Sequence, residues 1–458
     1  MFFRKRLRVI SLFIIACMLV FMLSGCGGNG LLDPRNPVTL TLWHTYAQRL
    51  NESIAQLVEE FNYTVGAEKG IIIQTSYVAD ASELNVRIMM AANNDPGAPA
   101  LPDLAVLNPR IGVALADMGL LLDLTTQFRP DELSLFVPDF IAEGKMGGNA
   151  LYILPIAKSI ELLYVNTTIF DRFSQATGVG YEQLSSFEGI IDASEKYYEW
   201  SGGKDFFYPV ELFNFAMVGF QQLGEEFKDG ELMNLSSPTF KRIWDAYYPP
   251  AVKGGVAIFD SYGNYLMSSG EIVCVLGTSA SVTFFPETVT YADNTKEECV
   301  LAILPHPVFE GGANVALQRG GGMGVFKSNS EKEYAAGIFL KWLTEPAQNL
   351  RFTAQTGYMP VTLSAFDDYM AKEYENVANQ NVHKLRATIV EMQESYTFYF
   401  PPVFSGFEEM QRSYNQTLRK AAENSRRDYL RLLESYDPDA AFEAATNGVF
   451  EQFIGIRE

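Results

Sequence analysis

The side chains in this 458-residue chain that could do chemistry suit hydrogen bonding and stacking better than bond cleavage. The chain has 3 histidines, and it contains neither an HExxH zinc motif nor a GxSxG nucleophile motif. Acidic residues number 55, so paired carboxylates of the glycosidase kind stay open as an alternative, although nothing in the sequence arranges them. The polar candidates stand where predicted strands end, and α/β sheets bind ligands at such ends.

The first candidates follow the segment that contains Trp43. His44 and Tyr46 offer a polar tip and an aromatic face, which suit the hydroxyls and C–H faces of sugars. The alternative is that His44 only begins a helix. Arg110 follows the predicted strand at 104–107 and could hold an anion, or it could be an ordinary loop cation.

Hydroxyl groups and glycines mark two further strand ends. Thr278, Ser279 and Ser281 end an apolar strand, and hydroxyls can both donate to and accept from polyol oxygens. They could instead satisfy nearby turn backbone. Gly321 and Gly322 precede another strand, where backbone amides can approach a ligand closely or where a plain loop is formed. Because no Gly-Lys-Ser/Thr follows, these glycines are not a P-loop.

The elements that position these candidates follow from hydrophobic periodicity. Strands and helices alternate from the start of the mature chain, which implies right-handed crossovers and a largely parallel α/β sheet. A Ser330-x-x-Glu333 capping box predicts the start of one helix. After Asp367 the chain is mainly helical, and the charged stretch 412–434 reads as a solvated helix surface. The predicted strands are 38–43, 71–73, 104–107, 151–156, 160–165, 272–276, 300–304 and 323–326, and the predicted helices include 50–61, 84–92, 187–200, 239–247 and 330–343.

The N-terminus predicts an exported and lipid-anchored protein. A basic start is followed by the apolar run 9–23, which is short for a membrane-spanning helix and typical of a secretory signal. The ending Leu-Ser-Gly-Cys resembles the bacterial lipobox, in which the peptide is cut before the cysteine that then carries lipid such as palmitate. We therefore expect a signal peptide at 1–25, lipid on Cys26 and a flexible tether at 26–37. An ordinary signal peptide with an incidental cysteine is the alternative.

Composition limits the partners and the domain number that this chain can have. The formal net charge of −20 makes nucleic acid a poor partner, because phosphate backbones need basic patches. The length suits two domains, and 48% hydrophobic residues can fill their cores. Cys274 and Cys299 both lie in apolar, strand-like runs, so they could be free and buried or could form a disulfide.

Several landmarks in order resemble the solute-binding subunits of ABC importers, and most closely the sugar-type family with its glycerol-phosphate-binding branch. They cover most of the mature chain: LTLWHTY at 40–46, LPDLAVL at 101–107, GLLLDLT at 119–125, LPIAKSIELLYVN at 154–166, SGEIVCVLGTSAS at 269–281, FLKWLTEPAQ at 339–348 and TGYMPVT at 356–362.

This resemblance implies a type II periplasmic-binding-protein-like α/β fold, with two lobes, a hinge and a ligand cleft between them. By this analogy the first lobe holds 38–156 and 283–328, and the second holds 157–282 and 329–458. The lobes would close over the ligand, since a ligand shifts a hinge equilibrium through its greater affinity for the closed state. The resemblance also implies a monomer that needs no cofactor or metal and that docks on ABC permease subunits.

The resemblance adds three candidate site residues. Lys158 and Ser159 lie where the family's chain crosses between lobes, although Lys158 could be a plain surface lysine. Tyr358 matches a tyrosine that faces ligand in the glycerol-phosphate branch, with a core tyrosine as the alternative. One departure is that Phe404 stands near the position where that branch carries an arginine. Without this anion clamp, a neutral sugar is as open as a phosphate held by Lys158 or Arg110.

We therefore expect a membrane-anchored binding protein that delivers a carbohydrate or polyol to an ABC permease. A lipoprotein that presents its ligand to a membrane receptor would have the same fold and stays an alternative. An extracellular glycoside hydrolase is the third class, and incubation with sugars would reveal its products.

Overall fold

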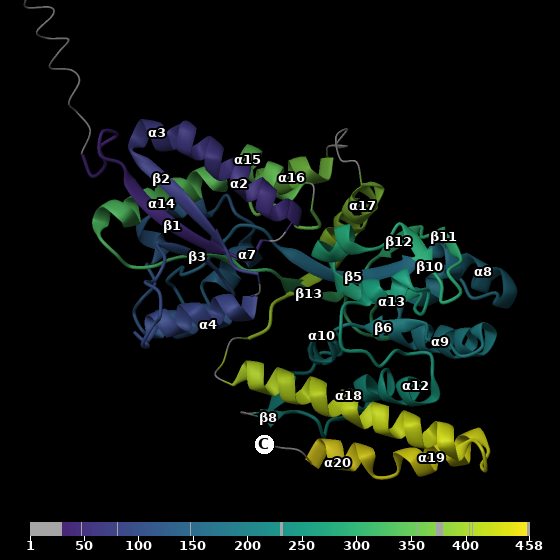
Figure 1. Ribbon diagram of the computed structural model, residues 1–458. Coiled ribbons are helices and arrows are strands. Elements are labelled where there is room, and N and C mark those ends of the chain that lie inside the picture. The colour runs from purple at the N-terminus through teal and green to yellow at the C-terminus, as the bar shows by residue number, and fades with distance from the viewer. Residues whose placement is uncertain are drawn as a thin grey trace, which may run out of the picture.

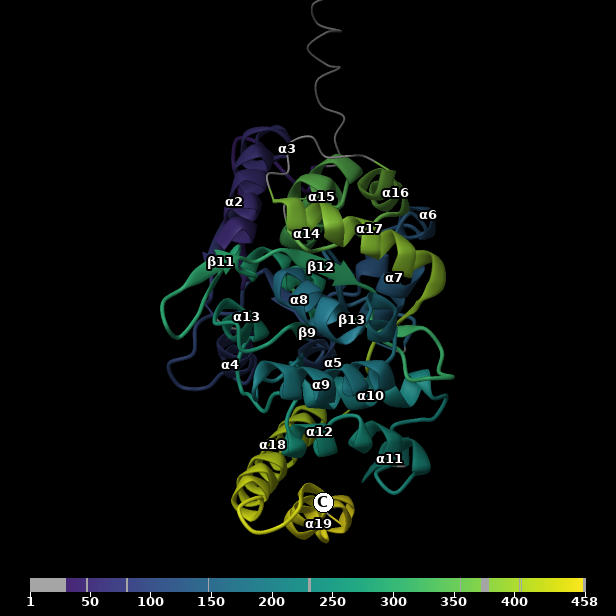
Figure 2. The same ribbon diagram turned by 90° about the vertical axis from the view of Figure 1, so that its right-hand side faces the viewer.

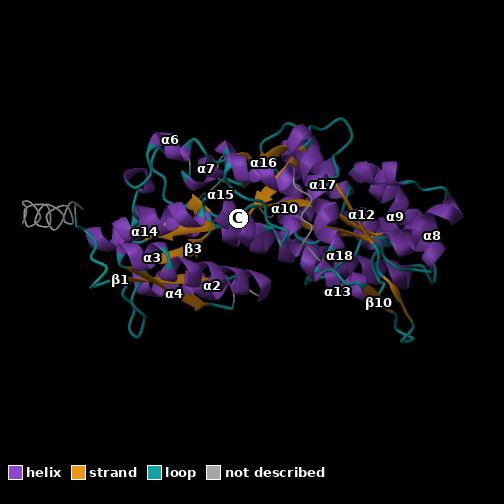
Figure 3. Ribbon diagram, turned by 90° about the horizontal axis from the view of Figure 1, so that it is seen from above, coloured by secondary structure: helices purple, strands orange, loops and turns teal. Residues whose placement is uncertain are grey.

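The computed structural model describes residues 30–455 apart from 47, 80, 147, 230–231, 355, 372–378, 403 and 405. Within them the chain forms two lobes, each built around a mixed β-sheet that helices cover (Figure 1). Viewed from above, the two lobes lie side by side (Figure 3). The expected signal peptide and Cys26 lie outside the described residues. In the described part of the chain, no helix combines the length and apolar character needed to span a membrane.

The first sheet has the strand order β2-β1-β3-β14-β4. β1 (Val38–His44) is parallel to β2 (Ile71–Tyr77) and β3 (Leu104–Leu107). β14 (Gly322–Val325) is antiparallel to both β3 and β4 (Leu154–Pro155), so the sheet is mixed where we expected a largely parallel one. The helices of this lobe are α2 (Gln48–Tyr63), α3 (Val65–Lys69), α4 (Ala81–Ala92), α5 (Pro109–Asp117), α6 (Pro130–Leu133), α7 (Pro138–Gly144), α14 (Ser330–Leu343), α15 (Pro346–Thr353) and α16 (Leu363–Ala371).

The second sheet is centred on β5 (Ser159–Asn166), all of whose residues are buried. β9 (Cys274–Thr278), β12 (Leu301–Leu304) and β13 (Val315–Arg319) are all antiparallel to β5. The outer strands are β6 (Phe207–Pro209), which pairs with β9, and β15 (Thr397–Tyr399), which pairs with β13. Around this sheet lie α8 (Thr167–Thr177), α9 (Phe187–Ser201), α10 (Leu212–Gln222), α11 (Pro238–Asp245), α12 (Tyr248–Lys253), α13 (Gly263–Ser268) and α17 (Gln380–Ser395).

A C-terminal group of helices extends the second lobe. α18 (Phe407–Leu432) lies along α12 and α10, and α19 (Pro438–Thr446) and α20 (Val449–Gly455) lie against it (Figure 2). The buried residues of α18 recur at helical spacing and are Phe407, Tyr414, Leu418, Ala422, Ser425 and Tyr429. Only the other faces of the helix form the solvated surface that we expected. The first turns of α18 point toward the first lobe (Figure 1).

The strand pairing corrects the expected lobe boundaries in two places. We placed 283–328 in the first lobe, but β12 and β13 pair with β5 of the second sheet, and only β14 returns to the first. We placed 329–458 in the second lobe, but α14 packs on β1 and α15 packs on α2. Both errors concern contacts between segments that are distant in the chain, namely strand pairing in the first case and helix packing in the second. Local periodicity does not specify such contacts.

Two crossings between the lobes run side by side. β4 leads into β5, and β13 leads into β14 through Gly320. Gly320 has a φ of 102°, and a Cβ there would lie 3.0 Å from the carbonyl oxygen of Ala157. Glycine at this position therefore lets the two crossings approach each other closely.

Two local features decide between interpretations that the sequence left open or add to them. Cys274 and Cys299 are both buried and free, so they form no disulfide with each other. α14 is capped by Asn329, whose side chain accepts a hydrogen bond from the Lys332 amide at 2.9 Å, rather than by Ser330 of the predicted capping box.

Candidate functional site

Two neighbouring cavities open where α18 of the second lobe approaches α4 and α5 of the first. We call them the Arg110 cavity, of about 620 Å³, and the Tyr262 cavity, of about 430 Å³. They share Glu211, Arg412 and Asn415 and are therefore two parts of one cleft. Volumes of this size are typical of small-molecule sites.

The walls of the Arg110 cavity come from both lobes. Positions 82, 85, 86 and 89 of α4 follow the spacing i, i+3, i+4 and i+7 and so form one face of that helix, while its buried residues face the core. From the first lobe the lining residues are Ser82, Asn85, Val86, Met89, Arg110 and Ile111. From the second lobe they are Glu211, Glu408, Gln411, Arg412 and Asn415.

Arg110 spans the cleft from the first lobe to α18. Its guanidinium carbon lies 4.2 Å from the ring centroid of Phe407, and its Nη1 donates to Gln411 at 3.2 Å. Glu408 lies 3.7 Å from the same nitrogen. Burial lowers the pKa of Arg110, while the charges of Glu408 and Glu211 oppose this. Arg110 thus links the first lobe to α18 across the cleft.

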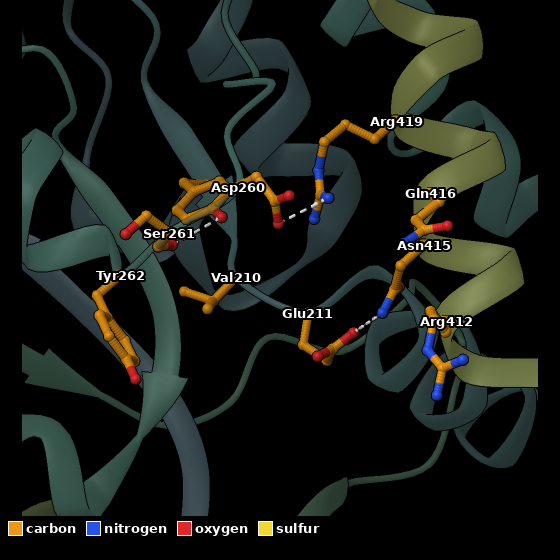
Figure 4. Close-up of a pocket in the computed structure, with 10 residues that line it drawn as sticks. Val210, Glu211, Asp260, Ser261, Tyr262, Arg412, Asn415, Gln416 and Arg419 are labelled. Atoms are coloured by element: carbon orange, nitrogen blue, oxygen red, sulfur yellow. Dashed lines mark hydrogen bonds and ion pairs between the residues drawn. The ribbon is translucent and has the colours of Figure 1, made fainter. Parts of the chain in front are cut away.

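The Tyr262 cavity has a loop of the second lobe on one side and α18 on the other (Figure 4). Asp260 of the loop forms an ion pair with Arg419 of α18 at 2.7 Å. Tyr208 donates its hydroxyl to the Ser261 carbonyl at 3.0 Å, and burial raises the pKa of Tyr208 to about 12. Tyr262 is 71% exposed. The cavity therefore combines charged side chains with an aromatic face.

Three aromatic candidates from the sequence lie together in the first lobe. The rings of His44 and Tyr46 stack at 5.6 Å, and burial together with Tyr358 raises the pKa of Tyr46. Burial lowers the pKa of His44 to about 4, so its imidazole is neutral at neutral pH. His44 is buried, and its Nδ1 has no hydrogen-bond partner among the residues described.

One hydroxyl candidate, Ser279, reaches the same region. Ser279 donates to the Gly357 carbonyl at 2.6 Å, beside Tyr358, and accepts from the Ile160 amide at 3.3 Å. Thr278 accepts a hydrogen bond from the backbone of the following turn, and Ser281 is half-buried. Two of the three hydroxyls are thus used by backbone, which was the alternative interpretation.

A sequence model described as bacterial extracellular solute-binding protein matches residues 56–379. The chain belongs to this solute-binding protein family. Membership of this family places the chain among extracytoplasmic binding proteins rather than enzymes. It also confirms the family that we inferred from the landmarks. A search of curated proteins by sequence found no match.

Solved structures agree with the two-lobed fold of this solute-binding protein. The cyclic α-maltosyl-1,6-maltose binding protein from Arthrobacter globiformis is 17% identical, with a TM-score of 0.65 over 92% of this chain and 100% of its own. Lmo0181 from Listeria monocytogenes, solved with cycloalternan, is 16% identical, and the match has a TM-score of 0.66 and covers 92% of this chain and 100% of Lmo0181. UgpB from Mycobacterium tuberculosis, solved with glycerophosphocholine, is 16% identical, and the match has a TM-score of 0.64 and covers 92% of this chain and 99% of UgpB. These likenesses confirm the fold class that we expected.

Lys158 of the solute-binding protein is neither a surface lysine nor an open anion contact. Its ammonium lies 2.6 Å from a carboxylate oxygen of Glu143 and donates to the Gly320 carbonyl at 3.1 Å. The two charged side chains are only 4% and 7% exposed. Ser159 is also buried, at the start of β5. The positive charge of Lys158 is therefore balanced within the crossing region.

Gly321 and Gly322 have a structural reason to be glycine. A Cβ at 321 would lie 2.6 Å from the Leu107 carbonyl oxygen, and one at 322 would lie 2.3 Å from that of Leu154. β14 thus packs closely between β3 and β4 at this point. We expected these glycines to let backbone amides approach a ligand closely. In the structure they let β14 approach the backbone of its neighbouring strands closely.

The charged residues of the second lobe in and near the cleft were not predicted from the sequence. Glu161 is buried in β5, where it accepts from Arg319 at 3.1 Å and from Asn214 at 3.2 Å. Burial raises the pKa of Glu161, and Arg319 opposes this. An acidic residue inside the apolar run SIELLYVN was an available signal, because unpaired charges are rarely buried. Glu211 and the α18 residues carried no comparable local signal. In the described residues, no group of three or more histidine, cysteine, aspartate or glutamate side chains could hold a metal ion.

Proposed function

We propose that this protein captures a sugar or polyol between its lobes and delivers it to the membrane subunits of an ABC importer. The observation that carries the proposal is a single cleft walled by both lobes, with carboxylate, guanidinium and amide groups beside the exposed ring of Tyr262. Such groups bind hydroxyls, and aromatic faces cover sugar C–H surfaces. Because both lobes contribute walls, a ligand bound there would favour the closed state.

The proposed ligand class has two further supports. The structural neighbours include binders of a cyclic maltosyl-maltose, cycloalternan and glycerophosphocholine, each of which carries hydroxyl groups. His44, Tyr46 and Tyr358 stay candidates for contacting part of the ligand from the first lobe, because they converge near the crossings.

A thermal-shift screen of sugars, polyols and their phosphates tests the proposal. A ligand at one hundred times its Kd should stabilise the protein by about 2.7 kcal/mol, which gives a clear rise in melting temperature. Calorimetry on each hit should give one site per chain. Conversion of a sugar into products during incubation, or no stabilisation by any member of the panel, would contradict the proposal.

The proposed membrane anchor needs a separate test. Tethering by lipid on Cys26 would raise the local concentration of the binding protein at the permease. Cys26→Ser should therefore leave the protein in the soluble fraction of bacterial cells, or uncleaved. If Cys26→Ser is processed and sediments with membranes as the wild type does, the anchor is wrong, whatever the ligand.

A further inference from the structure

The charges in and beside the cleft balance one another. Among the described residues, three guanidinium groups and three carboxylates line the two cavities: Arg110, Arg412 and Arg419, and Glu211, Glu408 and Asp260. Each of these guanidinium groups lies within ion-pair distance of a carboxylate, and so do the cations at the two lobe crossings. The pairs are Arg110 with Glu408, Arg412 with Glu409, Arg419 with Asp260, Lys158 with Glu143 and Arg319 with Glu161. An anionic group of a ligand would therefore have to displace a carboxylate of the protein from its cation.

One of these pairs, Arg319 with Glu161, is built into the second sheet. Arg319 ends β13 opposite Ser159, and Glu161 follows two residues later in β5, so both side chains point to the same face of the sheet. Thr278 of β9 lies directly opposite Glu161 and shares that face. Arg319 donates to Oε1 of Glu161 at 3.1 Å, and Asn214 of α10 donates to the same oxygen at 3.2 Å. Adjacent strands and α10 thus hold the pair in place.

Both members of the pair lie beside residues of the candidate site. Burial and then the charge of Arg319 lower the pKa of Arg110, and the charge of Arg319 also opposes the rise in pKa that burial causes at Tyr358. Burial raises the pKa of Glu161, and the charge of Glu211, which lines both cavities, adds to this. The pair is therefore close to the Arg110 cavity and to the aromatic candidates of the first lobe.

The pair keeps hydrogen-bonding groups that its protein neighbours do not use. The side chain of Arg319 is 42% exposed, and its hydrogen bond to Glu161 uses only one of the five N–H donors of a guanidinium group. Both hydrogen bonds to Glu161 go to Oε1. Its second oxygen, Oε2, accepts none from the described residues and is not fully enclosed. The pair can therefore both donate to and accept from a ligand.

We infer that the ligand of this cleft is an uncharged sugar or polyol, and that Arg319 and Glu161 together bind its hydroxyl groups. The inference rests on the proposed function, because it names the ligand class of the same cleft. One ligand hydroxyl would accept a hydrogen bond from Arg319, and another would donate to Oε2 of Glu161. Because the two protein charges cancel, both hydrogen bonds are charge-assisted without requiring a charge on the ligand.

Calorimetry with uncharged and anionic probes tests the charge of the ligand. The uncharged probes are maltose, cellobiose and trehalose, and the anionic probes are glycerol 3-phosphate, glucose 6-phosphate and galacturonate. The wild type should bind at least one uncharged probe roughly tenfold more tightly than every anionic probe. Added salt should leave that affinity unchanged, because salt screens interactions between charges. Titration at about pH 8 keeps Glu161 ionised, since burial raises its pKa.

Two variants test the pair itself. Arg319→Lys keeps a positive charge beside Glu161 but loses the fork of N–H donors, so it should weaken binding of the best uncharged probe roughly tenfold while the urea midpoint stays unchanged. Arg172→Lys is the matched control, because Arg172 forms an ion pair with Glu297 at 2.7 Å and lines neither cavity. Glu161→Gln removes the countercharge of Arg319, so it should weaken binding of the same probe and strengthen binding of the anionic probes.

Several outcomes would overturn the inference while the proposed function stands. They are tighter binding of an anionic probe by the wild type, unchanged affinity of Arg319→Lys for the uncharged probe, and a Glu161→Gln variant that keeps the wild-type preference. A lower urea midpoint of Arg319→Lys that accounts for its lost affinity would make the pair structural and would overturn the inference too. If no probe of either kind binds, both the inference and the proposed function are wrong.

Discussion

Replacing Lys158 with methionine should destabilise the protein without acting through a ligand. The Lys158 ammonium lies 2.6 Å from Glu143, and both side chains are almost completely buried. Gln318 donates to the same carboxylate oxygen. Methionine preserves most of the volume of lysine but leaves the Glu143 carboxylate buried with a single neutral donor and no countercharge.

The expected decrease in the free energy of unfolding follows from that unpaired charge. Breaking a buried ion pair by removing one partner costs about 3–5 kcal/mol, mainly because the remaining charge stays desolvated. Replacing both charges with uncharged groups of similar shape is far less costly. Lys158→Met should therefore lose about 4 kcal/mol, and the double variant Lys158→Met with Glu143→Gln should recover most of it.

Urea denaturation without ligand measures these differences. Lys69→Met is a matched control, since Lys69 pairs with Glu68 at 2.7 Å on the exposed surface and its loss should leave the midpoint unchanged. A midpoint for Lys158→Met equal to that of the wild type would refute the reasoning. So would a double variant that is no more stable than Lys158→Met alone. If Lys158→Met were stable but lost sugar binding, the direct ligand contact first expected from the sequence would be the correct role.

Three further predictions concern closure, the aromatic cluster and pH. Arg110→Ala should open the unliganded protein, because it removes contacts with Phe407, Gln411 and Glu408 worth about 1–3 kcal/mol, and an unchanged radius of gyration in small-angle scattering would contradict this. Tyr358→Ala should weaken binding of the sugar or polyol found by the screen by about 1–3 kcal/mol in calorimetry; a lower melting temperature without ligand would instead make Tyr358 a core residue. Burial lowers the pKa of His44 and His306 from 6.5 to about 4. Between these two pH values the unfolded chain therefore binds more protons than the folded chain does. The free energy of unfolding should accordingly fall as the pH drops from about 6.5 to 4. His306→Gln should flatten this dependence in urea titrations between about pH 7 and 5, and an equally steep dependence would show that burial of His306 is not its cause.

Local patterns predicted most elements because each depends on neighbouring residues. The segment 38–43 alternates apolar and polar residues, and it forms β1, in which Leu40 and Leu42 are fully buried. The apolar runs at 104–107 and 160–165 form β3 and β5 within one or two residues. The family landmarks then predicted two lobes, because they occur in the order and at the spacing of that fold.

The lobe boundaries depended on contacts that no local pattern contains. β13 is a five-residue segment ending in Gln318 and Arg319, and its apolar character is too brief to distinguish it from a loop. Its pairing with β5 and β15 decides that the chain stays in the second lobe until Gly320. The assignment of α14 to the first lobe likewise follows from its packing on β1.

The sequence by itself identified the family and predicted that the His44, Ser279 and Tyr358 segments converge, because strand order and strand ends follow from the fold. The export signal stays a prediction, because it lies outside the described residues. Only the tertiary structure decided what each charge does. Lys158 is neutralised because Glu143 of α7 is folded against it, and Arg110 reaches α18 across the cleft. Glu211 lines both cavities because it lies against α18, where its carboxylate accepts a hydrogen bond from Asn415. Ionic roles depend on distance and burial, which are set by residues far apart in the chain.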